Sequence, residues 1–285
     1  MNKTTPILFG AHMSISEGIY KSIERGESIG CTAIQIFTKS NRQWYAKPLD
    51  QEDINAFQNA WKKSSIKSII AHASYLINIG SPNNELAKKS VAALIEELNR
   101  CNMLSIPYLV LHPGSHSKTD IESCLQRISD NIDKALEKSD GKTHILLETM
   151  AGQGDSVGNT FEQLATIIKH SHHKSKLGVC LDTCHIFAAG YDFRTKEAYN
   201  ALWNLFDQTI GLEKLHAIHC NDSKTELNSR VDRHTDIGKG KIGLHAFELL
   251  FNDHRFAHIP KILETPKESL SDDLRNMKTI NALIK

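Results

Sequence analysis

Acidic residues and histidines recur in this sequence at one kind of position, the end of a short apolar segment. In LGVCLDTCHIFAAGYD (177–192), for example, Asp182 and His185 directly follow a run of apolar residues. Seven apolar segments end in this way, at His12, His72, His112, Glu148, Asp182, His219 and Glu264. Imidazole and carboxylate groups are common ligands of divalent metals. The seven positions therefore predict a metal site, provided that the fold brings them together.

A single residue of this kind has a simpler explanation. A buried Asp is often the N-cap of a helix, and a buried His often donates to a nearby carbonyl group. Several buried carboxylates are different, because they need compensating positive charge, and no Lys lies among the seven residues. As a set, they favour divalent cations.

A second set of polar residues lies in the segment HCNDSKTELNSRVDRHTDIGKG (219–240). Asp232 and His234 are two positions apart, so they point to the same side of an extended chain and could bind one ion together. A solvated polar loop is the alternative. We expect His185 as the partner of this pair, because the loops after the sixth and seventh apolar segments should be neighbours.

The apolar segments themselves predict the fold. Eight short β-branched runs, at 7–12, 33–37, 68–72, 108–112, 144–148, 178–182, 215–219 and 260–264, alternate with stretches of helical periodicity. Capping boxes are expected at Ser14, Thr119 and Thr160. Eight such repeats predict an α/β protein, a single (β/α)8 TIM barrel over residues 1–285. A doubly wound open sheet is disfavoured, because GAHMSISEG after the first run is no Gly-rich phosphate turn. In a barrel, the carboxyl ends of all strands meet on one face, where we expect the metal site.

Composition narrows the class of protein. The 285 residues are 40% hydrophobic and 24% charged, and no apolar run approaches the ~18 residues of a membrane helix. The apolar run within residues 1–12 is too short for the hydrophobic region of a signal peptide. We therefore expect a cytoplasmic protein without membrane contact. Six cysteines without a CxxC pair predict reduced thiols. A net charge of only +1 argues against nucleic-acid binding through a basic surface alone.

Many of these segments match one family. The motifs GAHMS, FTKSNRQW, HASYLINIGSP, HPGSH, LLETMAGQG, GVCLDTCHIFAAGYD, HCNDSK, SRVDRH, GKGKIG and PKILETP occur in this order along nearly the whole chain. With them the sequence resembles the endonuclease IV family of apurinic/apyrimidinic (AP) endonucleases, also called AP endonuclease family 2. The resemblance implies a barrel with three Zn²⁺ ions, which Mn²⁺ could replace. It also implies base excision repair: hydrolysis of DNA on the 5′ side of an abasic site, leaving a 3′-hydroxyl and a 5′-deoxyribose phosphate, and removal of 3′-blocking groups.

The resemblance also assigns roles to individual residues. The first metal would be held by His72, His112 and Glu148, the second by Glu148, Asp182, His219 and Glu264, and the third by His185, Asp232 and His234. Glu148, which would bridge two ions, is the expected catalytic residue, and His12 has a supporting role.

The expected partner is double-stranded DNA with an abasic or 3′-blocked site, and the family implies a monomer without an obligatory protein partner. Arg42, Tyr75 and Leu76 would insert into the base stack at the lesion. Trp44 could equally contact DNA or pack at the rim of the barrel. Backbone phosphates would be contacted by basic side chains, including Lys39, Arg42, Lys224, Arg230 and Lys239.

Two other functions stay open at this point. A metal-dependent sugar isomerase of related barrel fold would use two ions and would not need His185, Asp232 and His234. A non-catalytic protein that binds damaged DNA through structural zinc is less favoured, because structural zinc sites are usually rich in thiolates, whereas these candidate ligands are imidazoles and carboxylates.

Overall fold

The computed structural model describes residues 7–139 and 141–285, and its centre is a closed barrel of eight parallel strands. The strands are neighbours in the order β1-β10-β7-β6-β5-β4-β3-β2. Their bounds are β1 Phe9–Met13, β2 Ala33–Phe37, β3 Ser68–His72, β4 Tyr108–Leu111, β5 His144–Glu148, β6 Leu177–Asp182, β7 Leu215–His219 and β10 Lys261–Leu263. The predicted TIM-barrel fold is confirmed. That residues 1–285 form one domain stays a prediction, and residues 1–6 and 140 lie outside the described part.

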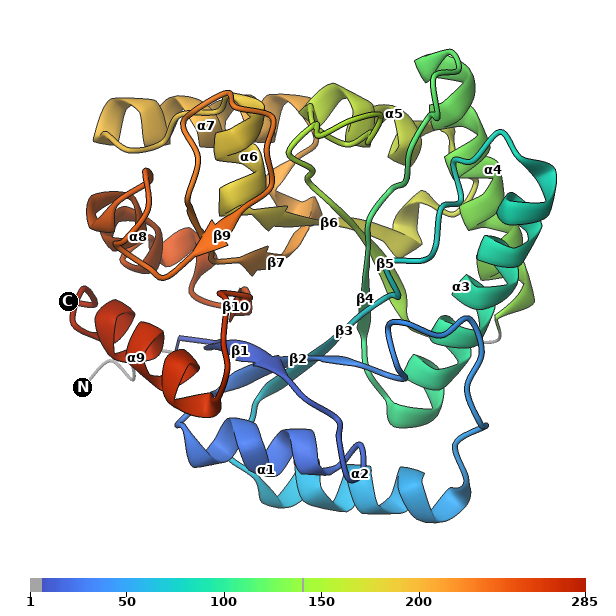
Figure 1. Ribbon diagram of the computed structural model, residues 1–285, viewed down its shortest axis with the longest axis horizontal. Coiled ribbons are helices and arrows are strands. Elements are labelled where there is room, and N and C mark those ends of the chain that lie inside the picture. The colour runs from blue at the N-terminus through green and yellow to red at the C-terminus, as the bar shows by residue number, and fades with distance from the viewer. Residues whose placement is uncertain (1–6, 140) are drawn as a thin grey trace.

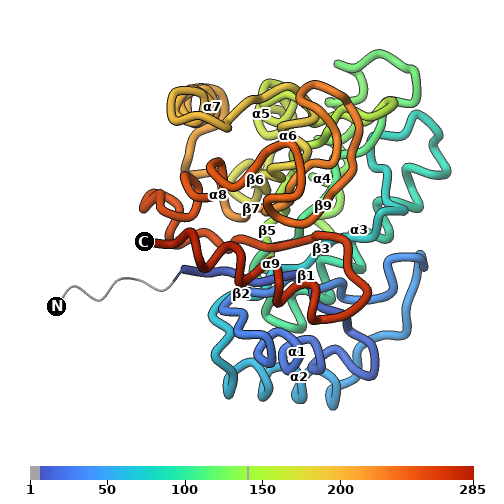
Figure 2. The backbone as a smooth tube through the Cα atoms, turned by 60° about the vertical axis from the view of Figure 1, so that its left-hand side comes forward, coloured from blue at the N-terminus to red at the C-terminus, as the bar shows by residue number. Residues whose placement is uncertain are grey.

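Helices surround the barrel, as Figure 1 shows. They are α1 Lys21–Ser28, α2 Gln51–Lys63, α3 Asn84–Leu104, α4 Ile121–Lys138, α5 Phe161–His170, α6 Thr183–Ala189, α7 Lys196–Thr209, α8 Leu244–Phe251 and α9 Leu270–Asn281. In the described part of the chain, short 3-10 helices also occupy Lys174–Lys176, Leu212–Lys214 and His254–Phe256. In both Figure 1 and Figure 2, α1 and α2 lie together on one side of the barrel, and α5 and α7 lie on the opposite side.

The strand pleat separates two layers of apolar side chains. Along β5, Ile145 and Leu147 belong to the large apolar cluster between the sheet and the helices, whereas Leu146 belongs to a small cluster inside the barrel. Because alternate residues of a strand point to the same face, Glu148 points inward like Leu146. The inner cluster consists of Ala33, Ile70, Val110, Leu146, Cys180, Ala217 and Ile262. The barrel is therefore a packed core, with its polar residues just beyond this layer.

Helix starts follow the predictions only in part. Thr160 is the N-cap of α5, and its hydroxyl accepts from the backbone N–H of Gln163. The reciprocal half of the predicted capping box is replaced, because the side chain of Gln163 accepts from the N–H of Gly158 instead. The prediction for Thr119 is wrong by one residue, because the carboxylate of Asp120 accepts from the N–H of Ser123 instead. No helix begins at Ser14, since α1 starts only at Lys21.

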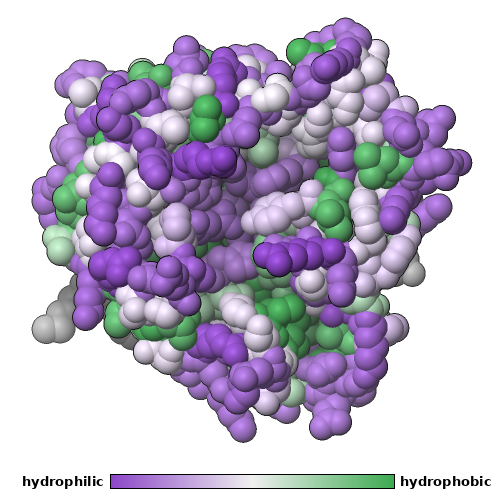
Figure 3. All heavy atoms as spheres, in the orientation of Figure 1, coloured by the Kyte–Doolittle hydropathy of each residue, from purple (hydrophilic) through white to green (hydrophobic). Residues whose placement is uncertain are grey.

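The face shown in Figures 1 and 3 is hollowed near its middle, and hydrophilic residues predominate around the hollow. All six cysteines are buried, without disulfide bonds. Within residues 7–139 and 141–285, no helix combines the length and the apolar character that crossing a membrane requires.

Candidate metal centre

The polar residues at the strand ends point into the mouth of the barrel because of their place in the pleat. Six of them lie two residues after a member of the inner apolar cluster, and so on the same face of their strand. The pairs are Ile70 and His72, Val110 and His112, Leu146 and Glu148, Cys180 and Asp182, Ala217 and His219, and Ile262 and Glu264. The alternation that fills the barrel thus also builds a ring of possible ligands above the core.

The first group of possible ligands is His72, His112 and Glu148. Oε2 of Glu148 lies 3.0 Å from Nε2 of His72 and 3.2 Å from Nε2 of His112. Glu148 and His72 are buried, whereas the side chain of His112 is 28% exposed. The group is therefore open toward solvent on the His112 side.

The second group shares Glu148 with the first. Its other oxygen, Oε1, lies 3.1 Å from Nδ1 of His219. The same nitrogen lies 3.1 Å from Oε2 of Glu264 and 3.8 Å from Oδ2 of Asp182. One carboxylate therefore faces the first group with one oxygen and the second group with the other.

The third group lies to the side of the ring and joins two loops. Nε2 of His185 lies 3.2 Å from Oδ2 of Asp232, whose Oδ1 lies 3.2 Å from Nε2 of His234. His234 belongs to β9 (His234–Thr235), which pairs with β8 (Asp222–Ser223) and so returns the loop to the mouth. In each group the candidate donor atoms lie within 4.8 Å of one another. All nine predicted ligands are thus placed in the three predicted groups, and their binding of metal stays a prediction.

The two carboxylate oxygens of Asp182 have different partners. Its Oδ1 accepts from the backbone N–H of His185 at 2.8 Å, which makes it the N-cap of α6. Its Oδ2 accepts from Nδ2 of Asn221 at 2.7 Å and faces the second group. Cys184 also lies close to Asp182 and His234, but burial raises the pKa of its thiol to about 12.

Backbone carbonyl groups select one ring nitrogen in three of the candidate histidines. Nδ1 of His72 lies 2.7 Å from the carbonyl oxygen of Ala73, Nδ1 of His185 lies 2.8 Å from that of Thr149, and Nδ1 of His234 lies 3.2 Å from that of Glu264. A carbonyl oxygen only accepts, so the proton resides on Nδ1 and Nε2 faces the group. Metal-binding histidines commonly have such a partner on the second nitrogen.

The electrostatics of the centre favour positive charge. Burial alone would raise the pKa of Glu148, but His219 and His112 outweigh it and hold that pKa well below the usual range. Burial likewise works against a charged His185, yet Asp182, Asp232 and Glu148 raise its pKa well above the usual range. Added positive charge is therefore favoured at this centre, and divalent cations could supply it.

The donor geometry fits divalent ions. A tetrahedral ion with bonds of ~2.1 Å separates its ligand atoms by about 3.4 Å, and the donor pairs described above lie 3.0 to 3.8 Å apart. Moreover, Nε2 of His185 and Nε2 of His234 are buried and make no well-aligned hydrogen bond within the described residues, although each lies 3.2 Å from an oxygen of Asp232. Buried polar atoms normally have a partner, and a cation would supply one.

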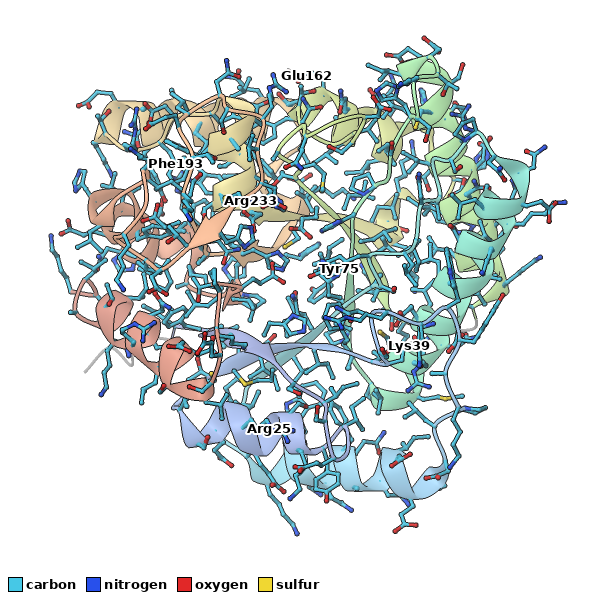
Figure 4. All side chains as sticks on the ribbon, viewed as in Figure 1. Arg25, Lys39, Tyr75, Glu162, Phe193 and Arg233 are labelled. Carbon is cyan, nitrogen blue, oxygen red and sulfur yellow. The ribbon has the colours of Figure 1, made fainter. Side chains whose placement is uncertain are left out.

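The predicted DNA-contacting residues lie around this centre. Tyr75 is 54% exposed, and its ring centroid lies 5.3 Å from that of His72 and 5.4 Å from that of His112; Figure 4 shows it near the middle of the barrel mouth. Leu76 is half-buried, and Arg42 is exposed. Trp44 is half-buried at the rim, with Nζ of Lys89 4.4 Å from its ring centroid. A role of Arg42, Tyr75 and Leu76 in DNA binding stays a prediction.

The prediction that Lys39 contacts a DNA phosphate is wrong. Its side chain is only 1% exposed, and Nζ donates to the carbonyl oxygen of Trp44 at 2.6 Å. The carboxylates of Glu96 and Glu97 lie 3.4 Å and 3.9 Å from the same nitrogen. Lys39 follows β2 and its ammonium group is enclosed beside α3 (Figure 4), so it forms an interior ion pair. The other basic residues predicted to contact phosphates are exposed: Arg42, Lys224, Arg230 and Lys239.

Glu97 joins the two loops that carry the predicted DNA contacts. Its Oε2 accepts from the hydroxyl of Thr38 at 2.6 Å, and its Oε1 accepts from the backbone N–H of Ser74 at 3.4 Å. The hydroxyl of Ser74 donates in turn to the carbonyl oxygen of Asn41. The loop with Arg42 and the loop with Tyr75 are thus tied together through one buried carboxylate.

Sequence reasoning missed three residues that support the centre. Gln35 in β2 contacts His219 and Glu264, and Asn221 contacts Asp182. The buried carboxylate of Asp222 accepts from the backbone N–H groups of Ser223, Gly238, Gly240 and Ile242 and so holds the loop with Asp232 and His234. The spacing could have revealed Gln35, since it lies two residues after Ala33 of the inner cluster.

Comparison with known proteins places this architecture in a family. A family model described as a xylose isomerase-like TIM barrel matches residues 23–283. A protein described as "Probable endonuclease 4" from Chloroflexus aggregans is 50% identical over 279 residues, which cover 97% of this chain and 98% of that protein. The chain belongs to the endonuclease IV family. The family resemblance of the sequence motifs is thereby confirmed.

Other members of the endonuclease IV family show the same agreement. A protein of the same description from Geobacter sulfurreducens is 46% identical over 97% of this chain and 94% of its own length. The crystal structure of endonuclease IV from Thermus thermophilus has a TM-score of 0.87 at 35% identity and covers 98% of each chain.

The barrel also resembles a protein outside this family. A D-tagatose 3-epimerase-like protein has a TM-score of 0.75 at only 20% identity, which shows a shared fold.

Proposed function

We propose that this chain hydrolyses the phosphodiester bond on the 5′ side of an abasic site in double-stranded DNA, with three zinc ions at the mouth of the barrel. Membership of the endonuclease IV family makes it a metal-dependent AP endonuclease, a hydrolase that cuts DNA. The products would be a 3′-hydroxyl and a 5′-deoxyribose phosphate. The same site would remove 3′-blocking groups, because only the bond between phosphorus and O3′ is broken.

The metal assignment rests on one observation. Glu148 is shared between two donor groups, and a third donor group lies beside them. Imidazole and carboxylate donors suit zinc, and Mn²⁺ could take the same positions. Divalent cations held here would supply Lewis acidity, which offsets the charge of a phosphodiester and makes water a better nucleophile at neutral pH. Four ligand carboxylates against three such ions leave a net charge of about +2, which suits a phosphate even though the chain is nearly neutral.

The chain's own residues hold this arrangement in place. Glu148 keeps the first two groups in a fixed relation, because each of its oxygens faces a different group. It is the residue that we assign to orienting the attacking water. Asp182 is held from both sides, by the N–H of His185 and by the amide of Asn221. Groups fixed in this way need little rearrangement when substrate binds.

Recognition of the lesion would depend on the loops beside the first group. Tyr75 projects over His72 and His112 while more than half of it is exposed. We assign Tyr75, Leu76 and Arg42 to the gap in the base stack, which would leave the abasic sugar free to turn toward the metal groups. Flipping costs least where a base is already missing. In this proposal the chain works as a single-domain monomer in the cytoplasm.

A sugar isomerase of related fold is the second candidate, supported by the fold shared with sugar epimerases. Those likenesses are below 25% identity and concern the fold alone. The group of His185, Asp232 and His234 favours the nuclease, because a two-metal isomerase would have no use for it. A closed structural zinc site is also a poorer match, since His112 leaves the first group open to solvent.

The test is incision of a duplex that contains one tetrahydrofuran abasic analogue, with metal content measured on the same sample. We expect about three zinc ions per chain and a cut directly 5′ of the analogue. An undamaged duplex of the same sequence and a ketose substrate are the controls, and neither should react. A chain with full metal content that leaves the abasic duplex uncut would overturn the proposed function.

A further inference from the structure

One position of the ring above the barrel core is filled by an amide. Gln35 of β2 lies two residues after Ala33 of the inner cluster and is completely buried. It thus has the place on its strand that His72 or Glu148 has on another. In the register of the sheet it is paired with His12 of β1.

Every polar atom of the Gln35 side chain has a partner. Its Nε2 lies 2.6 Å from Oε1 of Glu264 and 3.0 Å from Nδ1 of His12, and its Oε1 lies 2.8 Å from Nε2 of His219. The orientation of the amide follows from this chemistry, because a carboxylate only accepts and must therefore face the NH₂ group. The carbonyl oxygen is left to accept from His219.

This contact selects the ring nitrogen of His219 that faces the second group. With its proton on Nε2, His219 presents Nδ1 to Glu148 and Glu264, each with an oxygen at 3.1 Å. For His72, His185 and His234 a backbone carbonyl makes the same selection. For His219 a side chain makes it, so this selection can be removed by mutation.

We propose that Gln35 is a positioning residue for the second metal: it fixes the tautomer of His219 and the orientation of the Glu264 carboxylate. This inference rests on the proposed metal centre. It assigns to β2, which carries none of the nine candidate ligands, a specific part in the site. Loss of such a partner typically lowers metal affinity about 10- to 100-fold.

The test compares Gln35→Met with Ile36→Val. Methionine has a similar volume but neither donates nor accepts here, so the core stays filled while the three contacts are lost. Ile36 is the next residue and points to the helices instead, which makes Ile36→Val a control for altered packing of β2. Metal content after dialysis and competition with a chromophoric chelator give the stoichiometry and affinity of each variant.

We expect Gln35→Met to keep two ions tightly and to bind one about 10- to 100-fold more weakly, or to lose it. Ile36→Val should match the wild type. In the zinc-loaded protein, nitrogen NMR should show an exchange-protected Nε2–H of His219 that disappears in Gln35→Met.

If Gln35→Met does not fold, Gln35→Glu provides the test, because a carboxylate still accepts from His219 and should preserve the protected N–H signal. Three ions of wild-type affinity in Gln35→Met, or loss of the N–H signal in Gln35→Glu, would overturn the inference. A wild-type chain that binds no metal would instead overturn the proposed function, so the two failures are distinguishable.

Discussion

Replacing Glu97 by alanine should destabilise the protein strongly, although Glu97 is no candidate ligand. The substitution removes the acceptor of two hydrogen bonds, from the hydroxyl of Thr38 and the N–H of Ser74, and one carboxylate beside the buried Lys39. A hydrogen bond to a charged group contributes ~1.5–3 kcal/mol. Counting both at the low end, since the bond from Ser74 is long, gives a loss of about 3 kcal/mol. For a chain of this size that corresponds to a Tm lower by roughly 6–12 °C.

The assay is denaturant and thermal unfolding of the metal-loaded protein at a fixed zinc concentration, because metal release would otherwise add to the effect. Glu96→Ala is the matched control: Glu96 is the neighbouring residue on α3, also faces Lys39, and is 26% exposed. Glu96 accepts one hydrogen bond, from the N–H of Ala46 at 3.2 Å, and its partly exposed ion pair contributes ~1 kcal/mol or less, so Glu96→Ala should cost less than Glu97→Ala. Lys39→Met combined with Glu97→Leu should recover part of the stability, because no buried charge is then left alone.

Glu97→Ala should also impair DNA binding, because Glu97 ties the loop of Arg42 to the loop of Tyr75. We expect a higher KM for abasic duplex with a smaller change in kcat at a temperature where the variant is folded. A Glu97→Ala protein that is no less stable than Glu96→Ala would refute the reasoning, since it would show that this carboxylate is not needed by its partners.

Four further predictions concern other parts of the molecule. Glu148→Gln should leave the barrel folded and abolish incision, which circular dichroism and the abasic-duplex assay would show; a wild-type rate would refute its bridging role. Brief EDTA should leave activity intact, whereas prolonged chelation should remove both activity and zinc, because five of the nine candidate ligands are buried. Tyr75→Ala should raise KM for abasic duplex about 10-fold, within the range of a lost base-stacking contact, with little change in stability because Tyr75 is 54% exposed. Burial lowers the pKa of Lys261 to about 8, whereas the unfolded chain keeps this proton up to a pH of about 10.4. The stability of the wild type relative to Lys261→Met should therefore rise by up to ~3 kcal/mol between pH 8 and 10.4. A difference in unfolding free energy that stays constant over this range would count against the prediction.

The sequence by itself determined the barrel and the identity of the possible ligands. Eight apolar runs alternating with helical periodicity leave few other folds, because each run must be covered on both faces. The nine residues of the three groups could be named because parallel strands end on one face of a barrel, and because the motifs match one family. Gln35 lies inside an apolar run and bears no charge, so its residue type gave no signal, although its spacing from Ala33 is that of the candidate ligands on other strands.

The family motifs implied how these residues divide, but only the tertiary structure shows why they divide in this way and what supports them. Asp182 and His185 are three positions apart, yet they face different groups, because Asp182 caps α6 while His185 points toward Asp232. Lysine is usually a surface residue, but Lys39 is buried and forms an interior ion pair. Spacing along the chain fixes which face of a strand or helix a side chain occupies, whereas its partners come from segments far away in sequence, so their identity depends on the packing of the whole barrel.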